Sequence, residues 1–222
     1  MEVAYLPGGL TAEEIRSLVG DSPTMLELGA NDGEDTRRFL DAMPGIRLFC
    51  FEPDPRPATR WIRAIDDPRV QLFTSAIAAQ TGPTTLYLSG GSFPHPDNPM
   101  RDWDRSSGIH PPTGHLVRDR LVTFGRTIMV AGIRLDDWMS LGFTGTGLVD
   151  FIWADTQGAE RDIILGGRQT LRQTRYLYTE FYDVEQYQGQ PNLAEICQML
   201  PQFELLAVYS DGNGFFRNRD FL

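Results

Sequence analysis

The sequence predicts an α/β fold, an open and mostly parallel sheet that carries helices on both of its faces. Short apolar runs alternate along the chain with segments of helical periodicity, which is the pattern of repeated strand–helix–strand units. The run Leu-Val-Asp-Phe-Ile-Trp-Ala at 148–154 is almost wholly apolar, as a central strand of a parallel sheet must be. Ser-Asp-Gly-Asn-Gly at 210–214 is strong turn chemistry, and Phe215 and Phe216 restart an alternating pattern, so a terminal hairpin is expected.

The first half of the chain builds this pattern in a regular order. A capping box at Thr11-Ala-Glu-Glu14 opens a short helix that ends at Val19, and Asp21-Ser-Pro23 breaks the chain before the first strand. The elements expected next are strands at 24–28, 46–51 and 70–76, with helices at 36–43 and 58–65 between them. This order of strand, helix and strand is typical of a parallel sheet.

The second half continues the alternation after a long interruption. Residues 85–89 alternate like a half-exposed strand, and regularity then stops from Gly90 to about Phe124. The elements expected after it are strands at 127–133, 148–154, 175–181 and 203–209, with helices at 158–165 and 193–200. We expect one domain over residues 1–222, in which 1–22 form an N-terminal helix and lead-in and 90–124 form an insertion.

Composition indicates a protein that acts on small molecules. The formal net charge is -10, whereas nucleic-acid binding depends on clustered cations. No apolar run approaches the ~20 residues needed to cross a bilayer, and the first residues lack the features of a signal peptide. Cys50 and Cys197 lie within a predicted strand and a predicted helix, as buried thiols in a reducing compartment do. We therefore expect a cytoplasmic protein without membrane or nucleic-acid partners, and a homo-oligomer is compatible with these features.

The chain contains no lysine, since all 20 residues counted as Lys or Arg are arginines. This absence excludes enzymes whose chemistry depends on a lysine. Among them are Schiff-base enzymes, P-loop NTPases, protein kinases and short-chain dehydrogenases with a Tyr-x-x-x-Lys pair.

The loop after the first strand, together with an acid after the second, has the pattern of a nucleoside-binding site. Gly29 and Gly33 allow the chain between strand 24–28 and helix 36–43 to turn tightly beside a ligand. Glu52 ends the next strand roughly 20 residues further on, where a carboxylate can accept hydrogen bonds from both hydroxyls of a ribose. We therefore expect a ligand that contains adenosine, although the loop alone would also suit an ordinary tight turn.

The acidic residues of this loop indicate which adenosine ligand it binds. Dinucleotide-binding loops hold a pyrophosphate at the helix N-terminus, but here Asp32, Glu34 and Asp35 occupy that place. Carboxylates repel a pyrophosphate and attract a ligand that carries an ammonium and a sulfonium group. S-adenosylmethionine (SAM) fits this description better than a nicotinamide dinucleotide.

Acidic residues also gather at the carboxyl edge of the predicted sheet, where open α/β sheets bind ligands. They are Glu27, Glu52, Asp155 and Glu180. A divalent cation held by Asp155 and Glu180 would acidify a hydroxyl bound to it. Such a metal is not favoured, because the same carboxylates would equally balance the positive charge of SAM or cap helix N-termini.

The irregular segment 90–124 is expected to be a substrate lid. Loops longer than about 15 residues are uncommon in compact domains unless they cover or bind a ligand, or are disordered. The segment contains His110 and His115, and histidine is a suitable general base near neutral pH. Both are candidates for the group that takes the proton from an acceptor hydroxyl, although either would also be an ordinary surface-loop histidine.

Four segments resemble, in order, the FkbM-type methyltransferases, a branch of the class I SAM-dependent superfamily. They are Leu-Glu-Leu-Gly-Ala-Asn-Asp-Gly at 26–33, Phe-Glu-Pro-Asp at 51–54, Arg-Leu-Asp-Asp-Trp at 134–138 and Asp-Phe-Ile-Trp-Ala-Asp-Thr-Gln-Gly-Ala-Glu at 150–160. The resemblance runs from about Met25 to the C-terminus, and the last segment is the most specific. Trp153 departs from the pattern, because many members carry lysine there.

The resemblance implies a Rossmann-like fold with a seven-stranded sheet, to which the terminal hairpin adds one antiparallel strand. It also implies that the glycine loop lines the methionine end of SAM, that Glu52 holds the ribose, and that residues 53–54 and 75–77 flank the adenine. Asp155 and Gln157 would face the sulfonium and the acceptor. The expected cofactor site comprises Glu27, Gly29, Ala30, Asn31, Asp32, Gly33, Glu52, Pro53, Asp54, Ser75, Ala76, Ile77, Asp155 and Gln157.

The function that the residues and the resemblance indicate is SAM-dependent O-methylation of a small molecule. The acceptor would be a hydroxyl of a sugar, a polyketide or another natural product, and the candidate catalytic residues are His115, Asp155, His110 and Glu180. Two alternatives stay open, a nicotinamide-dependent oxidoreductase of Rossmann type and a noncatalytic SAM-binding scaffold.

Overall fold

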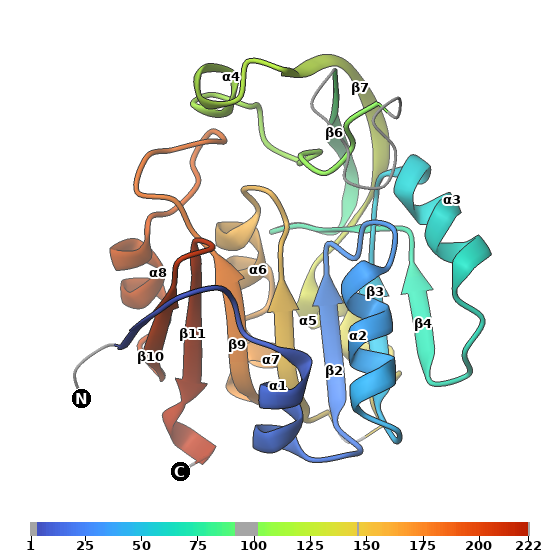
Figure 1. Cartoon of the computed structure of the whole chain (residues 1–222), viewed down its shortest axis with the longest axis vertical. Helices are drawn as coiled ribbons and strands as arrows, with labels where there is room; N and C mark the ends of the chain where they lie inside the picture. Colours follow the sequence, from blue (N-terminus) through green and yellow to red (C-terminus); the bar gives the residue numbers. More distant parts are fainter. Residues whose placement is uncertain (1–3, 92–101, 146, 222) are drawn as a thin grey trace.

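A mixed sheet forms the centre of the computed structural model, which describes residues 4–91, 102–145 and 147–221. Across these residues the sheet has eight strands in the order β1-β10-β11-β9-β8-β2-β3-β4 (Figure 1). Their bounds are β1 (Ala4–Leu6), β2 (Thr24–Leu28), β3 (Arg47–Phe51), β4 (Val70–Phe73), β8 (Val149–Ala154), β9 (Thr174–Glu180), β10 (Phe203–Tyr209) and β11 (Asn213–Asn218). Neighbouring strands pair in parallel, except that β11 is antiparallel to both β9 and β10. The predicted sheet with one antiparallel hairpin strand is thus confirmed.

The strand count of the prediction was wrong by one, because seven strands were expected and β1 is an eighth. β1 pairs in parallel with β10, from Ala4 opposite Ala207 to Leu6 opposite Tyr209. It has only three residues, and Tyr5 at its centre is 79% exposed, so its sequence carries no buried pattern. The strand forms because the free edge of β10 offers backbone hydrogen bonds. Pairing of this kind cannot be predicted from the local sequence of β1.

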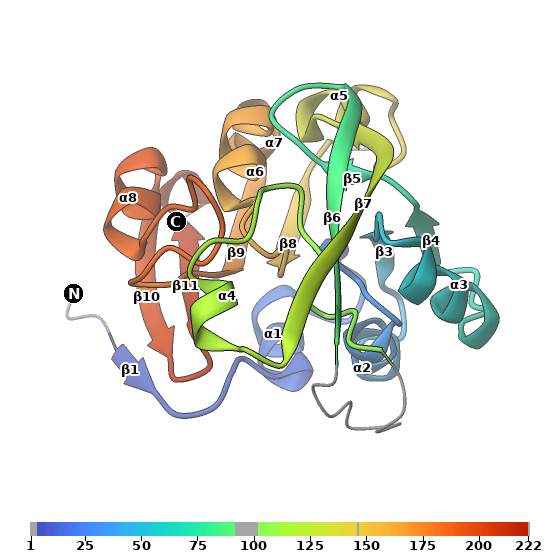
Figure 2. The ribbon, with the colours of Figure 1, turned by 90° about the horizontal axis from the view of Figure 1, so that it is seen from above.

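Helices cover both faces of the sheet, as predicted (Figure 2). One face carries α1 (Ala12–Val19), α2 (Glu34–Ala42) and α3 (Pro55–Ala64), and the other carries α5 (Leu135–Ser140), α6 (Glu160–Gly166), α7 (Arg168–Arg172) and α8 (Leu193–Met199). The expected capping box is present, since the Thr11 side chain accepts from the Glu14 amide while the Glu14 side chain accepts from the Thr11 amide.

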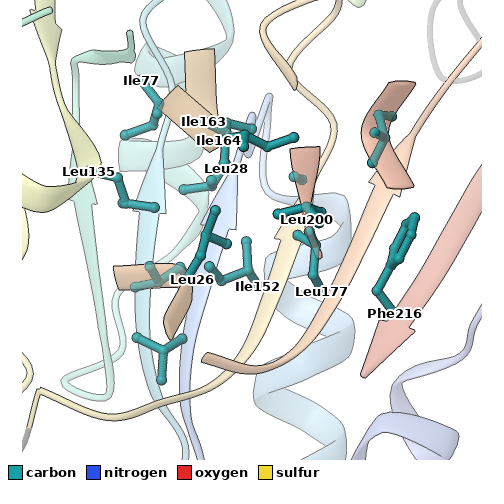
Figure 3. Close-up of a cluster of buried hydrophobic side chains, with 14 of the residues drawn as sticks. Leu26, Leu28, Ile77, Leu135, Ile152, Ile163, Ile164, Leu177, Leu200 and Phe216 are labelled. Carbon is teal, nitrogen blue, oxygen red and sulfur yellow. The ribbon is translucent and has the colours of Figure 1, made fainter. Parts of the chain in front are cut away.

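The central strands β2 and β8 are covered on both faces, which explains why most of their residues are apolar. In β2, Met25 packs among the residues beneath α1 and α2, whereas Leu26 and Leu28 pack into the core on the other face. Figure 3 shows Leu26 and Leu28 beside Ile152 of β8 in this second core. Alternate side chains of one strand therefore serve two separate hydrophobic layers. Because the strands are parallel, their carboxyl ends lie together at one edge.

A second, smaller sheet rises above that edge. It contains β5 (Ala76–Ile77), β7 (Val122–Ile133) and β6 (Gly82–Gly91), and β6 and β7 form a long antiparallel pair. The strands predicted at 85–89 and 127–133 lie within β6 and β7, which are both longer than expected. The described part of the segment between them contains α4 (His115–Arg118) and lies over the carboxyl ends of the main sheet (Figure 1). Residues 92–101 of the predicted lid lie outside the described residues.

A 3-10 turn, Arg219–Phe221, follows β11. Within the described ranges, no helix combines the length and the apolar character needed to span a bilayer.

Candidate active site

A cavity lies at the carboxyl edge of the main sheet, where the ends of β2, β3 and β8 meet beneath the segment that joins β6 to β7. Its lining comes from the glycine loop after β2, the ends of β3 and β8, strands β5 and β6, and the overlying segment. The lining residues are Gly29, Ala30, Asn31, Asp32, Glu34, Asp35, Phe51, Glu52, Pro53, Ser75, Ala76, Ile77, Leu86, Asp104, Arg105, Ser107, Gly108, Ile109, Asp155, Thr156, Gln157 and Ala159. This is the edge at which open α/β sheets bind ligands.

The glycine loop is held in place by the ends of the neighbouring strands. The amides of Gly29 and Ala30 both donate to the carbonyl of Phe51. Gly29 has a φ of 92°, and a Cβ atom there would stand 1.8 Å from the carbonyl oxygen of Asp155. Only glycine satisfies both conditions, because other residues rarely adopt this conformation and none fits the contact. The loop therefore passes close to β8 and leaves its polar groups facing the cavity.

Glu52 lies at the floor of the cavity with both of its carboxyl oxygens bound to the backbone. Oε2 accepts from the amide of Asn31 at 2.9 Å, and Oε1 accepts from the amide of Asp54 at 2.7 Å. The side chain is buried, and burial raises the pKa of Glu52 to about 8 even though these hydrogen bonds oppose the shift. Each oxygen keeps a further lone pair, which suits hydroxyl donors such as those of a ribose.

Most of the predicted cofactor residues line this cavity. They are Gly29, Ala30, Asn31, Asp32, Glu52, Pro53, Ser75, Ala76, Ile77, Asp155 and Gln157. The structure thus brings together the loop, the ribose candidate, the two segments expected beside the adenine, and the two residues expected beside the sulfonium.

Three predicted cofactor residues do not line the cavity. Glu27 is buried beneath the loop, where it accepts hydrogen bonds from Thr36 Oγ1 at 2.6 Å and from Cys50 Sγ at 3.1 Å. Gly33 is the left-handed residue that starts α2. Asp54 caps α3 through the amide of Arg56 and forms an ion pair with the same arginine. All three shape the elements around the cavity, and burial raises the pKa of Glu27 to about 8.

The segment over the cavity supplies lining residues that sequence patterns did not identify. Arg105 reaches the glycine loop, with its Nη2 3.1 Å from Glu34 Oε2. Asn31 Nδ2 donates to the backbone carbonyl of Asp104, which ties the loop to the overlying segment. Ser107 Oγ donates to Asp54 Oδ2 at 2.8 Å. The sequence of this segment has no helical or strand periodicity. Its length predicted that it covers a ligand, but no sequence pattern predicted which of its residues make these contacts.

Asp155 is the one predicted catalytic residue that lines the cavity. Its side chain is exposed to the space within the cavity, yet the surrounding protein is dense enough that burial raises its pKa to about 6. Gln157 Nε2 donates to Asp155 Oδ1 at 2.6 Å and partly offsets this shift. A carboxylate with a pKa near 6 is charged at neutral pH and basic enough to accept a proton.

Glu180 is joined to Asp155 through Gln157. Gln157 Nε2 lies 3.1 Å from Glu180 Oε2, and Tyr182 donates its hydroxyl to Glu180 Oε1 at 2.6 Å. Burial, followed by the charge of Asp155, raises the pKa of Glu180 well above its ordinary value. Gln157 itself has a φ of 51°, and its Oε1 accepts from the hydroxyl of Tyr187 at 3.0 Å. The amide therefore stands fixed between two carboxyl groups.

His110 and His115 lie outside the lining of the cavity. His115 is buried in α4, where its ring packs edge-on against Phe124 and Tyr187 and burial lowers its pKa. His110 Nε2 lies 2.6 Å from Asp162 Oδ2, and this hydrogen bond raises the pKa of His110. Both histidines thus have contacts that fix the overlying segment to its neighbours.

The metal alternative rested on Asp155 and Glu180, which the structure does bring close to one another. In the described ranges, no group of three or more histidine, cysteine, aspartate or glutamate side chains is arranged to hold a metal ion. The group between the two carboxyls is the amide nitrogen of Gln157, which is a hydrogen-bond donor and not a ligand.

The sheet order, the antiparallel strand between β9 and β10, and the cavity above β2 and β3 define the class I methyltransferase fold. The family model described as the Methyltransferase FkbM domain matches residues 27–210. The chain is also 44% identical over 191 residues to the 2-O-methyltransferase NoeI of Sinorhizobium fredii. The aligned region covers 86% of this chain and 76% of NoeI. This protein therefore belongs to the FkbM methyltransferase family, and SAM is its expected cofactor.

Solved structures give weaker similarities. A putative rRNA-methylase from Clostridium thermocellum is 9% identical with a TM-score of 0.49, over 92% of this chain and 90% of that chain. Aeropyrum pernix fibrillarin in complex with SAM is 13% identical with a TM-score of 0.48, over 93% of this chain and 71% of that chain.

Proposed function

We propose that this protein transfers the methyl group of SAM to a hydroxyl oxygen of a small molecule. The observation that carries the proposal is the single cavity in which Glu52, the acidic glycine loop and Asp155 face the same space. The similarity to a 2-O-methyltransferase supports oxygen as the atom that is methylated. Family membership disfavours the alternative of a nicotinamide-dependent oxidoreductase.

The residues of the cavity fit the cofactor. Gly29 lets the loop pass against the backbone of Asp155, so the loop and the end of β8 line the same cavity. Asn31 Oδ1 is buried without a hydrogen-bond partner among the described residues, so it is available to a donor such as an ammonium group. Glu52 would hold the ribose, and Ser75, Ala76 and Ile77 would contact the adenine. When bound, SAM supplies an electrophilic methyl group.

The protein's own task is then to place the acceptor oxygen and to remove its proton. We assign the removal of the proton to Asp155, because its carboxylate faces the cavity and has a pKa raised to about 6. Gln157 would orient that carboxylate through the 2.6 Å hydrogen bond. Glu180, which Gln157 also contacts, is the second candidate.

The segment 102–121 would act as a lid over this site, in keeping with the predicted lid at 90–124. Asp104, Arg105 and Ser107 all line the cavity from above. The ion pair of Arg105 with Glu34 would have to adjust when a cationic cofactor approaches the acidic loop.

The experiment is single-turnover methyl transfer at saturating SAM, with release of S-adenosylhomocysteine measured against a panel of methyl glycosides, phenols and hydroxy acids. Asp155→Asn keeps an oxygen for Gln157 but removes the base, so the rate should fall by about 10²- to 10⁴-fold. The wild-type rate should rise with pH and level off above about 6, because the carboxylate must be charged to accept the proton. His110→Gln is the control, since it changes a charged contact outside the cavity.

Three outcomes would contradict parts of the proposal. A rate in Asp155→Asn within about threefold of wild type would remove Asp155 as the base and direct attention to Glu180. SAM binding without release of S-adenosylhomocysteine for any acceptor in the panel would indicate a noncatalytic scaffold. Binding of NAD in place of SAM would refute the methyltransferase assignment.

A further inference from the structure

Tyr187 lies where the loop between β9 and α8 meets the segment that overlies the cavity (Figure 1). The two backbones are joined on either side of it. Tyr187 forms an antiparallel bridge with Pro112, and the carbonyl of Gln186 accepts from the amides of Thr113 at 2.8 Å and His115 at 3.3 Å. The overlying segment is therefore anchored on this loop, and Tyr187 is part of the anchor.

The ring of Tyr187 is completely buried against two glycines. A Cβ atom on Gly158, in the loop after β8, would stand 2.5 Å from the Cβ of Tyr187. A Cβ atom on Gly108, in the overlying segment, would stand 3.3 Å from Cε1 of the ring and 2.5 Å from the carbonyl oxygen of Gln157. The ring thus packs where the loop that carries Gln157 and the segment above it touch one another.

The hydroxyl of Tyr187 reaches two carbonyl oxygens. Its oxygen lies 2.7 Å from the backbone oxygen of Ser106, in the overlying segment, and 3.0 Å from Oε1 of Gln157. Both partners are acceptors only, whereas a tyrosine hydroxyl carries one proton. Burial, followed by the charge of Glu180, raises the pKa of Tyr187 well above its ordinary value, so the hydroxyl keeps that proton at neutral pH. One proton therefore serves both the cover of the cavity and the side chain beside Asp155.

The contact at Oε1 restrains the end of Gln157 that the carboxyl groups leave free. Nε2 donates to Asp155 Oδ1 at 2.6 Å and to Glu180 Oε2 at 3.1 Å, which fixes the nitrogen end of the amide. A glutamine side chain has several rotamers, and holding it in one of them costs conformational entropy. The hydroxyl of Tyr187 fixes the carbonyl end, so the whole amide is held in one position.

We propose that Tyr187 is a positioning residue for methyl transfer, whose hydroxyl holds the amide of Gln157 against Asp155 beneath the overlying segment. The inference rests on the proposed function, in which Asp155 accepts the proton, and adds a residue that acts on this base. Tyr187 is not among the residues that line the cavity, so it acts through Gln157 and not on a ligand. Its contact with Ser106 holds the cover of the cavity in the same conformation.

Tyr187→Phe tests the proposal, because it removes the hydroxyl and keeps the ring that packs against Gly158. The first measurement is the titration of Asp155 in the full chain, followed through the side-chain carboxyl resonances of ¹³C-labelled aspartate and assigned with Asp155→Asn. The hydrogen bond from Gln157 lowers the pKa of Asp155. A poorly held Gln157 should therefore raise the titration midpoint of Asp155 by about 0.3 to 1 on the pH scale.

The variant leaves the charges around Asp155 as they are. The other charged groups that interact with Asp155 are Asp35, Arg105, Glu160, Glu180 and Asp211. Tyr187→Phe replaces none of them, so a change in the midpoint of Asp155 reports on the hydrogen bond from Gln157.

A double-mutant cycle separates the two contacts of the hydroxyl. In a Gln157→Ala background, Tyr187→Phe should leave the titration of Asp155 unchanged, because its route to that carboxylate is gone. The contact with the overlying segment should still be lost. Backbone amides of residues 104–110 should then exchange about 2- to 10-fold faster with Phe than with Tyr at 187, in either background, the worth of one hydrogen bond.

Tyr178→Phe is the matched control. Tyr178 is another buried tyrosine, and its hydroxyl donates to Asp211 at 2.8 Å, so the variant removes a buried hydrogen bond without changing a charge. It should alter neither the midpoint of Asp155 nor the exchange of residues 104–110. Calorimetry with S-adenosylhomocysteine on the wild type and each variant measures cofactor binding separately and needs no acceptor.

Three results would overturn the proposal while leaving the methyltransferase assignment intact. The first is a midpoint of Asp155 that is the same in Tyr187→Phe and the wild type. The second is a shift that is equally large in the Gln157→Ala background, since Tyr187 would then act by another route. The third is an equal shift in Tyr178→Phe, which would indicate general loosening of the fold. Failure of the wild type to bind S-adenosylhomocysteine would instead refute the proposed function, and the titration and exchange measurements would still decide whether Tyr187 acts on Asp155.

Discussion

Glu52 should bind SAM as a carboxylate, although its pKa of about 8 makes it mostly neutral in the free protein. At pH 7 a group with that pKa is protonated in roughly nine of ten molecules. Donation by two ribose hydroxyls, together with the positive charge of SAM, favours the ionised form. Binding at pH 7 should therefore release about 0.9 proton per cofactor, and affinity should rise about tenfold per pH unit up to about pH 8.

Calorimetry in two buffers with different ionisation enthalpies measures this proton directly. Glu52→Gln should release none and should weaken SAM by about 1.5 to 3 kcal/mol, because a charged hydrogen-bond partner is lost. Glu27→Gln is the matched control, since Glu27 is equally buried and has a pKa of about 8 but lies outside the cavity. A binding heat that is the same in both buffers, with an unchanged dissociation constant in Glu52→Gln, would refute the assignment of the ribose site.

Two further predictions concern stability and the lid. Glu27 has a pKa of about 8 when folded and an ordinary value of 4.5, so between these values the folded state holds the extra proton and stability falls as pH rises. In urea unfolding between pH 5 and 8, Glu27→Gln should reduce the fall in unfolding free energy by up to about 1.4 kcal/mol per pH unit. Identical pH dependence in the variant and the wild type would contradict a raised pKa of Glu27. Backbone amides of residues 102–121 should exchange more slowly with S-adenosylhomocysteine than without it, while those of β4 stay unchanged. Equal exchange in the two states would show that the segment is not a lid.

The parts of the fold that sequence patterns predicted are those whose residues carry a buried periodicity. β2 and β8 contribute apolar side chains to the cores on both faces of the sheet, and the capped helix α1 has a local hydrogen-bonding signal at Thr11. β1 has neither property, because its side chains are exposed and its backbone pairs with a strand about 200 residues away along the chain. Long-range pairing of an exposed strand leaves no trace in local sequence.

The candidate site divides in the same way. Gly29 and Glu52 were predictable because each follows directly after a strand, whose carboxyl end fixes its place. The contact of Arg105 with Glu34 depends on how an irregular segment folds back over the sheet. His115 was a reasonable candidate by chemistry, but its position is set by packing against Phe124 and Tyr187, which come from other elements.

The lead-in between β1 and α1 joins the beginning of the described chain to its last strands. Gly8 donates its amide to Ser210 Oγ across 202 positions, and the amide of Asp211 donates to the carbonyl of Gly8. We expect such contacts to form after the intervening sheet, because closing a loop of this length by itself is entropically costly. The same strip has few buried side chains, so it should be the last part to fold and the first to open. Gly9 and Leu10 of this strip line a cavity between α1 and α2 that also reaches Asp155. A local opening of the strip would expose that cavity while the core stays folded.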